Sequence, residues 1–153
     1  MLNGLPEDLR LAVMDADDLA VVSAHLQDAE MTIGDMAFLP AQARFALALS
    51  RFDWPLAAQG RFARCAAGLH FERVLKVSRS GLPEPGSADT LRLLAIAFVQ
   101  DPEPPSGHVL LTFVGGGRIR LKVECLEAEM RDLGSRWDVP GRPPLLDASP
   151  QSD

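Results

Sequence analysis

The chain has few cysteines, no tyrosine, few lysines and no long hydrophobic run. Its two cysteines are too few for a disulfide scaffold and are typical of a protein in a reducing compartment, so we expect a cytoplasmic location. No run approaches the roughly 18 apolar residues that a membrane span requires, so no span is expected. The first residues, MLNGLPEDLR, lack the basic and apolar regions of a secretory signal.

Positive charge is also scarce. Lysine and arginine total 15 against 21 aspartates and glutamates, which gives a net charge of −6. Because nucleic-acid binding needs a dominant positive field, we expect no nucleic-acid partner. Nearly all the basic residues are arginine, the only lysines being Lys76 and Lys122, and this bias is typical of a GC-rich coding genome.

What remains is an ordinary globular composition, with 47% hydrophobic residues in 153. A chain of this length buries about two-thirds of its unfolded surface in one domain. We therefore predict a single domain over residues 1–138. Proline, glycine, serine and aspartate dominate residues 139–153, which predicts a disordered tail.

The hydrophobic pattern predicts a strand–helix unit followed by strands. Residues 9–14 form a short apolar strand, and Asp15 has the place of an N-cap for a helix that reaches about Ala29. The apolar stripe of that helix is Leu19, Val22 and Leu26.

Seven strands then follow, between about Met31 and Glu124. They are residues 31–33 and 36–39 joined by a hairpin at Gly34-Asp35, then 44–52, 62–78 with a bulge or bend at Arg73-Val74, 90–100, 108–114 and 118–124. Three consecutive glycines, Gly115 to Gly117, predict the turn before the last strand. A final amphipathic helix is predicted from about Glu124, with its stripe at Leu126, Met130, Leu133 and Trp137.

Because no β–α–β alternation follows the first helix, the sheet should be antiparallel, giving an α+β, predominantly antiparallel β fold. Seven strands, a C-terminal helix and an N-terminal β–α lead-in resemble the pleckstrin-homology-like seven-strand barrel, which a C-terminal helix caps. That fold hosts many functions, so it indicates none by itself.

Five stretches carry a closer resemblance. They are DLAVVSAHLQDA (18–29), RFALALSRFDW (44–54), LHFERVLKV (69–77), LLAIAF (93–98) and GGGRIRLKVECLEAEMRDLG (115–134). They resemble the uncharacterised bacterial domain-of-unknown-function family 2948. The resemblance implies a bacterial, single-domain, cytoplasmic protein and supplies no activity, substrate or site.

No pattern of residues predicts catalysis or a cofactor. The residues that could ligate zinc are Cys65, His70, His108 and Cys125, and no two of them have the close spacing of a structural zinc site, so we expect no metal. Ser23 and His25 lie two apart on the first helix and point to different sides. No G-x-S-x-G elbow is present, so we predict no catalytic residue and favour a protein that is not an enzyme.

The candidate binding residues are a basic row and an aromatic pair. Arg118, Arg120 and Lys122 alternate with apolar residues, so they should face solvent together. Basic residues of another strand (Arg73, Lys76 and Arg79) could extend that face. The ordinary alternative is a solvated face whose charges pair with Glu72 and Glu124. Phe52 and Trp54 flank a loop, where they either pack beneath it or anchor a partner.

From these residues we predict a non-enzymatic binding or scaffolding module with an acidic protein partner. One alternative is a small-molecule-binding protein or small enzyme that uses the open barrel end. Another is a structural homodimer, paired through an exposed strand edge. The roles of His25, His70 and His108 stay open.

Overall fold

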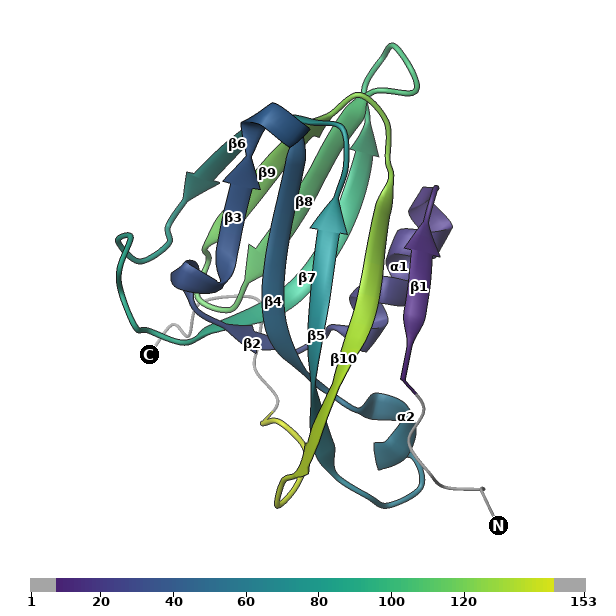
Figure 1. The fold of residues 1–153 in the computed structure, drawn as a ribbon, viewed down its shortest axis with the longest axis vertical. Coiled ribbons are helices and arrows are strands. Elements are labelled where there is room, and N and C mark those ends of the chain that lie inside the picture. The colour runs from purple at the N-terminus through teal and green to yellow at the C-terminus, as the bar shows by residue number, and fades with distance from the viewer. Residues whose placement is uncertain (1–7, 145–153) are drawn as a thin grey trace.

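The computed structural model describes residues 8–144 and shows a strongly bent antiparallel sheet with a helix packed beside it (Figure 1). Residues 1–7 and 145–153 lie outside the described residues, and with them most of the predicted tail. Within the described part, no helix is long and apolar enough to cross a membrane.

The helices are α1 (Ala16–His25) and α2 (Trp54–Ala57), and two 3₁₀ turns are η1 (Ile33–Asp35) and η2 (Pro40–Gln42). The strands are β1 (Arg10–Val13), β2 (Glu30–Met31), β3 (Met36–Leu39), β4 (Arg44–Phe52), β5 (Ala63–Phe71), β6 (Val74–Ser80), β7 (Leu91–Gln100), β8 (Gly107–Phe113), β9 (Arg118–Val123) and β10 (Ala128–Asp138).

The ten strands form one sheet in the order β1-β10-β5-β4-β2-β7-β8-β9-β6, and β3 pairs with β4. In Figure 1 the sheet bends so that β3, β4, β5 and β10 form a front layer, with β6 to β9 behind it. The inward side chains of both layers fill one core, which includes Phe71, Phe113 and Leu121. The sheet is not closed, because its path ends at β1 on one side and at β6 on the other.

The N-terminal unit forms largely as predicted. Asp15 caps α1 by accepting a hydrogen bond from the Asp18 N–H at 2.8 Å, and the stripe Leu19, Val22 and Leu26 is buried. The helix ends at His25 rather than near Ala29. Beyond it, Asp28 has a φ of 64° and donates its N–H to the Leu93 carbonyl at 2.9 Å, so the chain has left helical geometry.

Several strand predictions are confirmed as well. The strand over 44–52 is β4, and the alternation in β9 places Ile119, Leu121 and Val123 in the core. In the turn before β9, Gly115 and Gly116 have φ values of 94° and 100°, which L side chains rarely adopt. A strand-dominated α+β fold with an antiparallel sheet is therefore correct.

Two local predictions are wrong. Gly34-Asp35 is not a hairpin turn, because Thr32 and Asp35 form a capping box around η1 and β2 pairs with β4 and β7 instead of β3. The predicted long strand over 62–78 is two strands, β5 and β6, separated at Arg73, which has a φ of 58°. The predicted bulge lies just beyond, as a register shift against β9 between Val74 and Lys76.

The prediction of a final helix is also wrong, because residues 128–138 form strand β10, which pairs with β1 and β5. Ala128, Met130 and Asp132 point inward, whereas Leu133 and Trp137 are 56% and 44% exposed. A C-terminal helical cap is therefore absent from the described chain. With ten strands in an open sheet, the seven-strand pleckstrin-homology-like barrel is not confirmed.

The chain after β10 packs back on the molecule as far as it is described. Val139 donates its N–H to the Phe62 carbonyl at 2.9 Å, and the Arg142 guanidinium lies 5.4 Å from the centre of the Phe62 ring. Arg142 also donates to the Ala57 carbonyl of α2 at 3.2 Å.

Candidate functional site

A basic row lies on the outer face of β9, where Arg118, Arg120 and Lys122 are exposed. Their register partners on β6 are Ser80, Ser78 and Lys76, and those on β8 are Thr112, Leu110 and His108. Side chains directly across neighbouring strands lie about 5 Å apart, so each basic residue has close neighbours on both sides. We call Lys76, Arg118, Arg120 and Lys122 the basic face.

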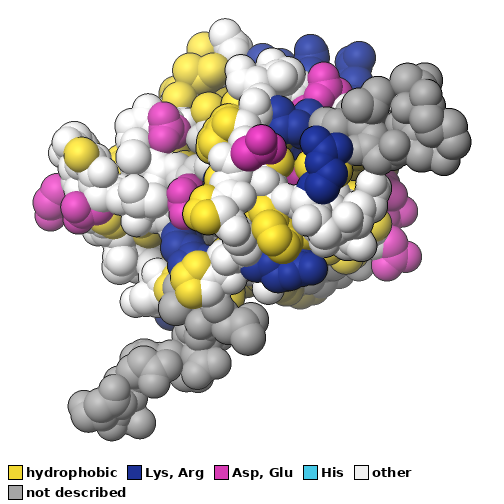
Figure 2. Space-filling view, turned by 90° about the horizontal axis from the view of Figure 1, so that it is seen from below, with side chains coloured by type: hydrophobic (Ala, Val, Ile, Leu, Met, Phe, Trp, Pro, Cys, Tyr) yellow, Lys and Arg dark blue, Asp and Glu magenta, His cyan; other side chains and the backbone are white. Residues whose placement is uncertain are grey.

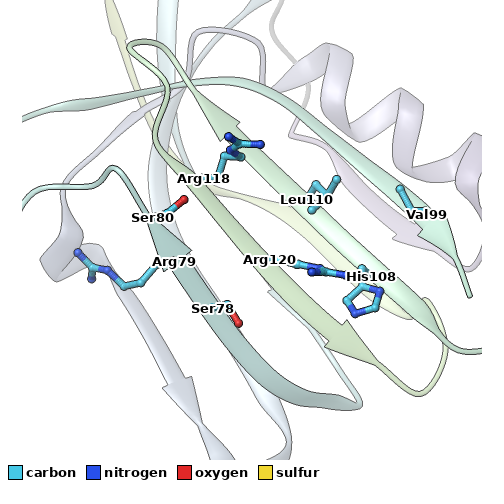
Figure 3. A pocket seen from close by; sticks show the side chains of 8 residues that line it. All are labelled: Ser78, Arg79, Ser80, Val99, His108, Leu110, Arg118 and Arg120. Atoms are coloured by element: carbon cyan, nitrogen blue, oxygen red, sulfur yellow. The ribbon is translucent and has the colours of Figure 1, made fainter.

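This face is hollowed. A depression of about 420 Å³ is lined by Ser78, Arg79, Ser80, Val99, His108, Leu110, Arg118 and Arg120. Figure 3 shows Arg118 and Arg120 on the middle strand, with Ser78 and Ser80 on one side and Leu110 and His108 on the other. The hollow thus combines the guanidinium groups of Arg118 and Arg120 with the hydroxyl groups of Ser78 and Ser80 and an apolar margin.

The charges at one end of the basic face are compensated. The Asp101 carboxylate lies 3.6 Å from Lys122 Nζ and 3.0 Å from His108 Nδ1. Around Arg118 and Arg120, by contrast, no described carboxylate lies within ion-pairing distance. Glu72, a predicted neutralising partner, is bound elsewhere, at 2.8 Å from Arg44 and 2.7 Å from His70.

Of the other predicted basic residues, one belongs to the basic face and two point elsewhere. Lys76 belongs to the basic face, because its register partner is Lys122. Arg79 points away from Ser78 and Ser80 and donates to the Pro83 carbonyl (Figure 3). Arg73 lies in the turn before β6, where its guanidinium is 3.3 Å from Glu127.

The aromatic pair is elsewhere, at the end of β4. Phe52 is fully buried and makes an edge contact with Trp54, their ring centres 4.6 Å apart. The Trp54 indole donates to the Gln27 carbonyl at 3.1 Å. Phe52 therefore packs within the fold, with the half-buried Trp54 against it. The sheet order separates β4 from β9 by three strands. Figure 2 views the end of the molecule where α2 lies and shows basic, acidic and hydrophobic side chains interspersed there.

The sequence analysis does not predict a buried ionic cluster that the structure contains. Arg51 and Asp132 form a bidentate pair, with both N–O distances 2.8 Å, and their side chains are 1% and 0% exposed. Arg136 adds a contact to Asp53 at 3.1 Å. The signal was present, because Arg51 continues the inward phase of Phe45, Leu47 and Leu49.

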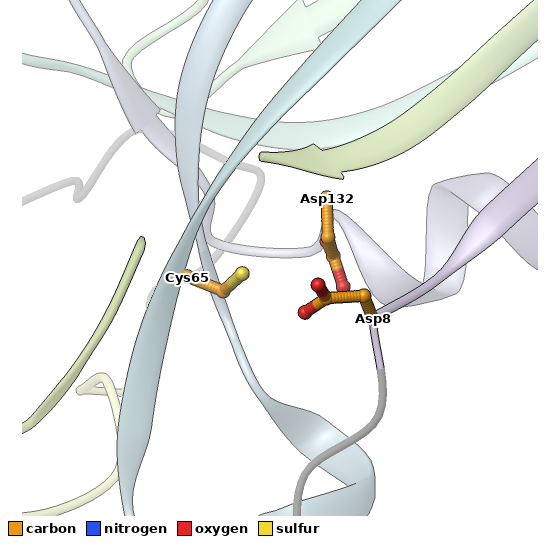
Figure 4. Close-up of side chains that lie close together, drawn as sticks. All are labelled: Asp8, Cys65 and Asp132. Carbon is orange, nitrogen blue, oxygen red and sulfur yellow. The ribbon is translucent and has the colours of Figure 1, made fainter. Parts of the chain in front are cut away.

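The same end of the sheet holds the one group of potential metal ligands found among the described residues: Asp8, Cys65 and Asp132 (Figure 4). Their ligand atoms lie within 4.8 Å of one another. However, Arg51 already neutralises Asp132, and burial raises the pKa of the Cys65 thiol, with the Asp132 charge adding to the effect. These conditions disfavour a thiolate–cation site. The four predicted candidates, Cys65, His70, His108 and Cys125, are not brought together in the described chain.

Comparison with known families gives a match to the family described as "Protein of unknown function (DUF2948)", over residues 9–144. The matched range covers every helix and strand described above. No curated protein and no solved structure gives a significant match.

Proposed function

Since the chain belongs to the DUF2948 family, whose description assigns no activity, we propose its function from the site alone: a non-enzymatic binding module whose basic face engages an acidic protein partner. The observation that carries the proposal is the pair Arg118 and Arg120. Both are exposed, both line the hollow, and no described carboxylate compensates either one. On a chain of net charge −6, uncompensated cations gathered in one place favour an anionic ligand.

The chemistry of the hollow favours carboxylates on a protein surface. A guanidinium group offers a planar fork of donors that matches a carboxylate in bidentate geometry. Ser78 and Ser80 add hydroxyl groups that can donate further hydrogen bonds. Leu110 and Val99 supply apolar contact at the margin, as protein interfaces usually do beside their charged anchors.

The arrangement around His108 favours binding over acid–base catalysis. Its Nδ1 lies beside Asp101, which resembles part of a catalytic triad. The nearest lining hydroxyl groups are on β6, however, and β9 separates β6 from β8. Two strand spacings amount to roughly 10 Å, too far for His108 to take a proton from Ser78.

We also propose that the module acts in the bacterial cytoplasm. Both cysteines are free, and Cys65 is buried on the inner face of β5, which suits a compartment where thiols stay reduced.

The test is capture of partners by the immobilised protein from native cytoplasmic extract, with each captured protein quantified by mass spectrometry. Arg118→Ser/Arg120→Ser should capture an acidic partner severalfold less well, at a nearly unchanged melting temperature, because exposed strand charges contribute little to stability. The matched control is Arg10→Ser/Arg131→Ser, which removes two register-paired arginines from the β1–β10 edge. Equal capture by the wild type and by the Arg118/Arg120 variant would overturn the proposal.

A second candidate function is supported by a separate groove. About 570 Å³ of space lies between the start of α1, the end of β7 and the segment after β9, lined by Met14, Asp15, Ala16, Phe98, Gln100, Pro105, Cys125 and Leu126. Its largely apolar lining suits a small hydrophobic molecule. An uncharged probe such as N-phenylnaphthylamine should then fluoresce with the wild type and less with Met14→Asp, a change at a side chain that is 67% exposed. Equal fluorescence with both proteins would exclude this groove as the binding site of the probe.

A further inference from the structure

β6 is the most accessible edge of the sheet. It has seven residues and pairs only with β9 among the described strands. On the side of β6 that faces away from β9, only the first residue makes a backbone hydrogen bond to another described segment. Val74 donates its N–H to the Ala43 carbonyl at 2.8 Å. From Leu75 to Ser80 every residue is exposed or half-buried. An edge of this kind leaves about half of its backbone donors and acceptors available for a further strand.

The other edges offer less. β1 and β3 have four residues each, and the arginine on β1 is already paired, with Arg10 Nε 3.2 Å from Glu129. β6 is longer and carries Lys76 and Arg79, and neither has a described carboxylate within ion-pairing distance. These two cations lie on opposite faces of the strand, since Lys76 pairs with outward Lys122 and Arg79 with buried Ile119.

The charge of an incoming strand determines whether it can pair with the free edge of β6. Two copies of this chain joined antiparallel through β6 would place their two basic faces side by side on one continuous sheet, and like charges gathered in this way disfavour the pairing. An acidic strand would instead meet Lys76 directly and Arg118 and Arg120 on the next strand inward. The edge therefore repels itself and suits a partner of opposite charge.

We propose that the free edge of β6 receives an extended acidic segment of the partner as an additional antiparallel or parallel strand. The inference rests on the proposed function and deepens it, because the added strand would lie beside the basic face. Backbone hydrogen bonds to β6 would supply affinity, and alternate side chains would supply specificity. Residues on the outer face of the segment should be acidic, opposite Lys76. Those on its inner face should be apolar, because Val77 faces the core.

The probe is a synthetic eight-residue peptide of alternating glutamate and valine, blocked at both ends. Residue-resolved hydrogen exchange by NMR is measured with and without saturating peptide. The β6 amides that point away from β9 should exchange about tenfold or more slowly when the peptide is bound, because a new strand removes them from water. The same peptide with every backbone nitrogen methylated has no N–H to donate to β6, so it cannot form the ladder and should give no such protection.

Lys76→Ser should weaken binding of the glutamate–valine peptide about twofold to fivefold, as expected for one partly exposed charge pair, because only Lys76 lies on the face that the glutamates occupy. Arg10→Ser/Arg131→Ser is again the control and should bind as the wild type does. If the peptide binds in an Arg118- and Arg120-dependent manner and no β6 amide gains protection, strand addition is wrong and the basic face alone binds the peptide. Binding that survives the loss of Arg118 and Arg120 while β6 is protected would refute the proposed function and retain the strand addition.

Discussion

At the scale of single residues, the buried pair of Arg51 and Asp132 makes the stability of the fold depend on charge. Burial would raise the pKa of the Asp132 carboxyl, but hydrogen bonds from Arg51 and from the Leu9 N–H outweigh burial and lower it below its ordinary value. The ionised carboxylate is therefore favoured in the folded state. Its contribution is present at neutral pH and is lost as the pH falls through the lowered pKa of the folded protein.

Asp132→Asn should lower the free energy of unfolding by about 3–5 kcal/mol, because it removes the bidentate partner of the buried Arg51 guanidinium and leaves only the Asp53 carboxylate, 3.9 Å away. Urea unfolding measures the change. Arg51→Met/Asp132→Leu removes both charges and should recover most of the loss, since replacing a buried pair by apolar groups is often neutral. A loss below about 1 kcal/mol for Asp132→Asn would mean that the pair is accessible to water in solution.

His25 gives the expected pH dependence. Burial, and then the positive charge of Arg51, lower the pKa of His25 below its ordinary value, and its Nδ1 is buried without a hydrogen-bond partner among the described residues. The unfolded chain therefore binds the proton more readily than the folded one. Stability is complete above the unfolded pKa of about 6.5 and declines as the pH falls below it.

His25→Gln should remove this decline. The measurement is the difference in unfolding free energy between wild type and variant at several pH values from about 7.5 to about 5. The wild type should lose stability relative to the variant as the pH falls. Parallel curves would show that His25 takes up no extra proton on unfolding.

At the scale of elements, the sequence correctly predicts the strands and helices whose hydrophobic pattern is uninterrupted. β9 alternates strictly between charged and apolar residues, and α1 has an aspartate cap and one apolar stripe, so local chemistry and burial agree. β10 was mistaken for a helix because Asp132 occupies an inward position, which hides the two-residue period. The remaining apolar residues, Met130, Leu133 and Trp137, then match a helical spacing by chance.

A pair of substitutions checks this assignment. Met130→Ala should cost about 2–5 kcal/mol, because Met130 is fully buried in the core. Leu133→Ala should cost less than about 0.5 kcal/mol, because Leu133 points outward from β10. A helix with its stripe in the core would give large losses for both, so comparable losses in urea unfolding would contradict the strand.

The candidate site was predictable only in part. Exposure of Arg118 and Arg120 follows from alternation, and the glycine turn predicts that β9 pairs with β8. The hollow also needs the pairing of β9 with β6, a strand distant in sequence, and no local pattern specifies that register. The same limit hid the cluster of Arg51 with Asp132, which are 81 residues apart. Phe52 and Trp54 carried no local signal that separates packing from exposure.

At the scale of the whole molecule, the charge distribution is the feature that links the fold to the proposed function. The net charge is −6, while the basic face and the adjoining edge of β6 concentrate cations that the described carboxylates leave largely uncompensated. An acidic partner should therefore be repelled from most of the surface and attracted to this one region. Such contrast guides encounter and orients the partner before close contact forms.

The most direct measurement is the dissociation constant of a blocked octaglutamate peptide for the wild type and for Arg118→Ser/Arg120→Ser, each at several salt concentrations. Binding to the wild type should weaken steadily as salt shortens the Debye length from about 10 Å at 0.1 M toward about 3 Å at 1 M. The variant should bind severalfold more weakly at low salt and depend less on salt. Identical dissociation constants for the two proteins across the series would contradict a basic face that binds acidic partners.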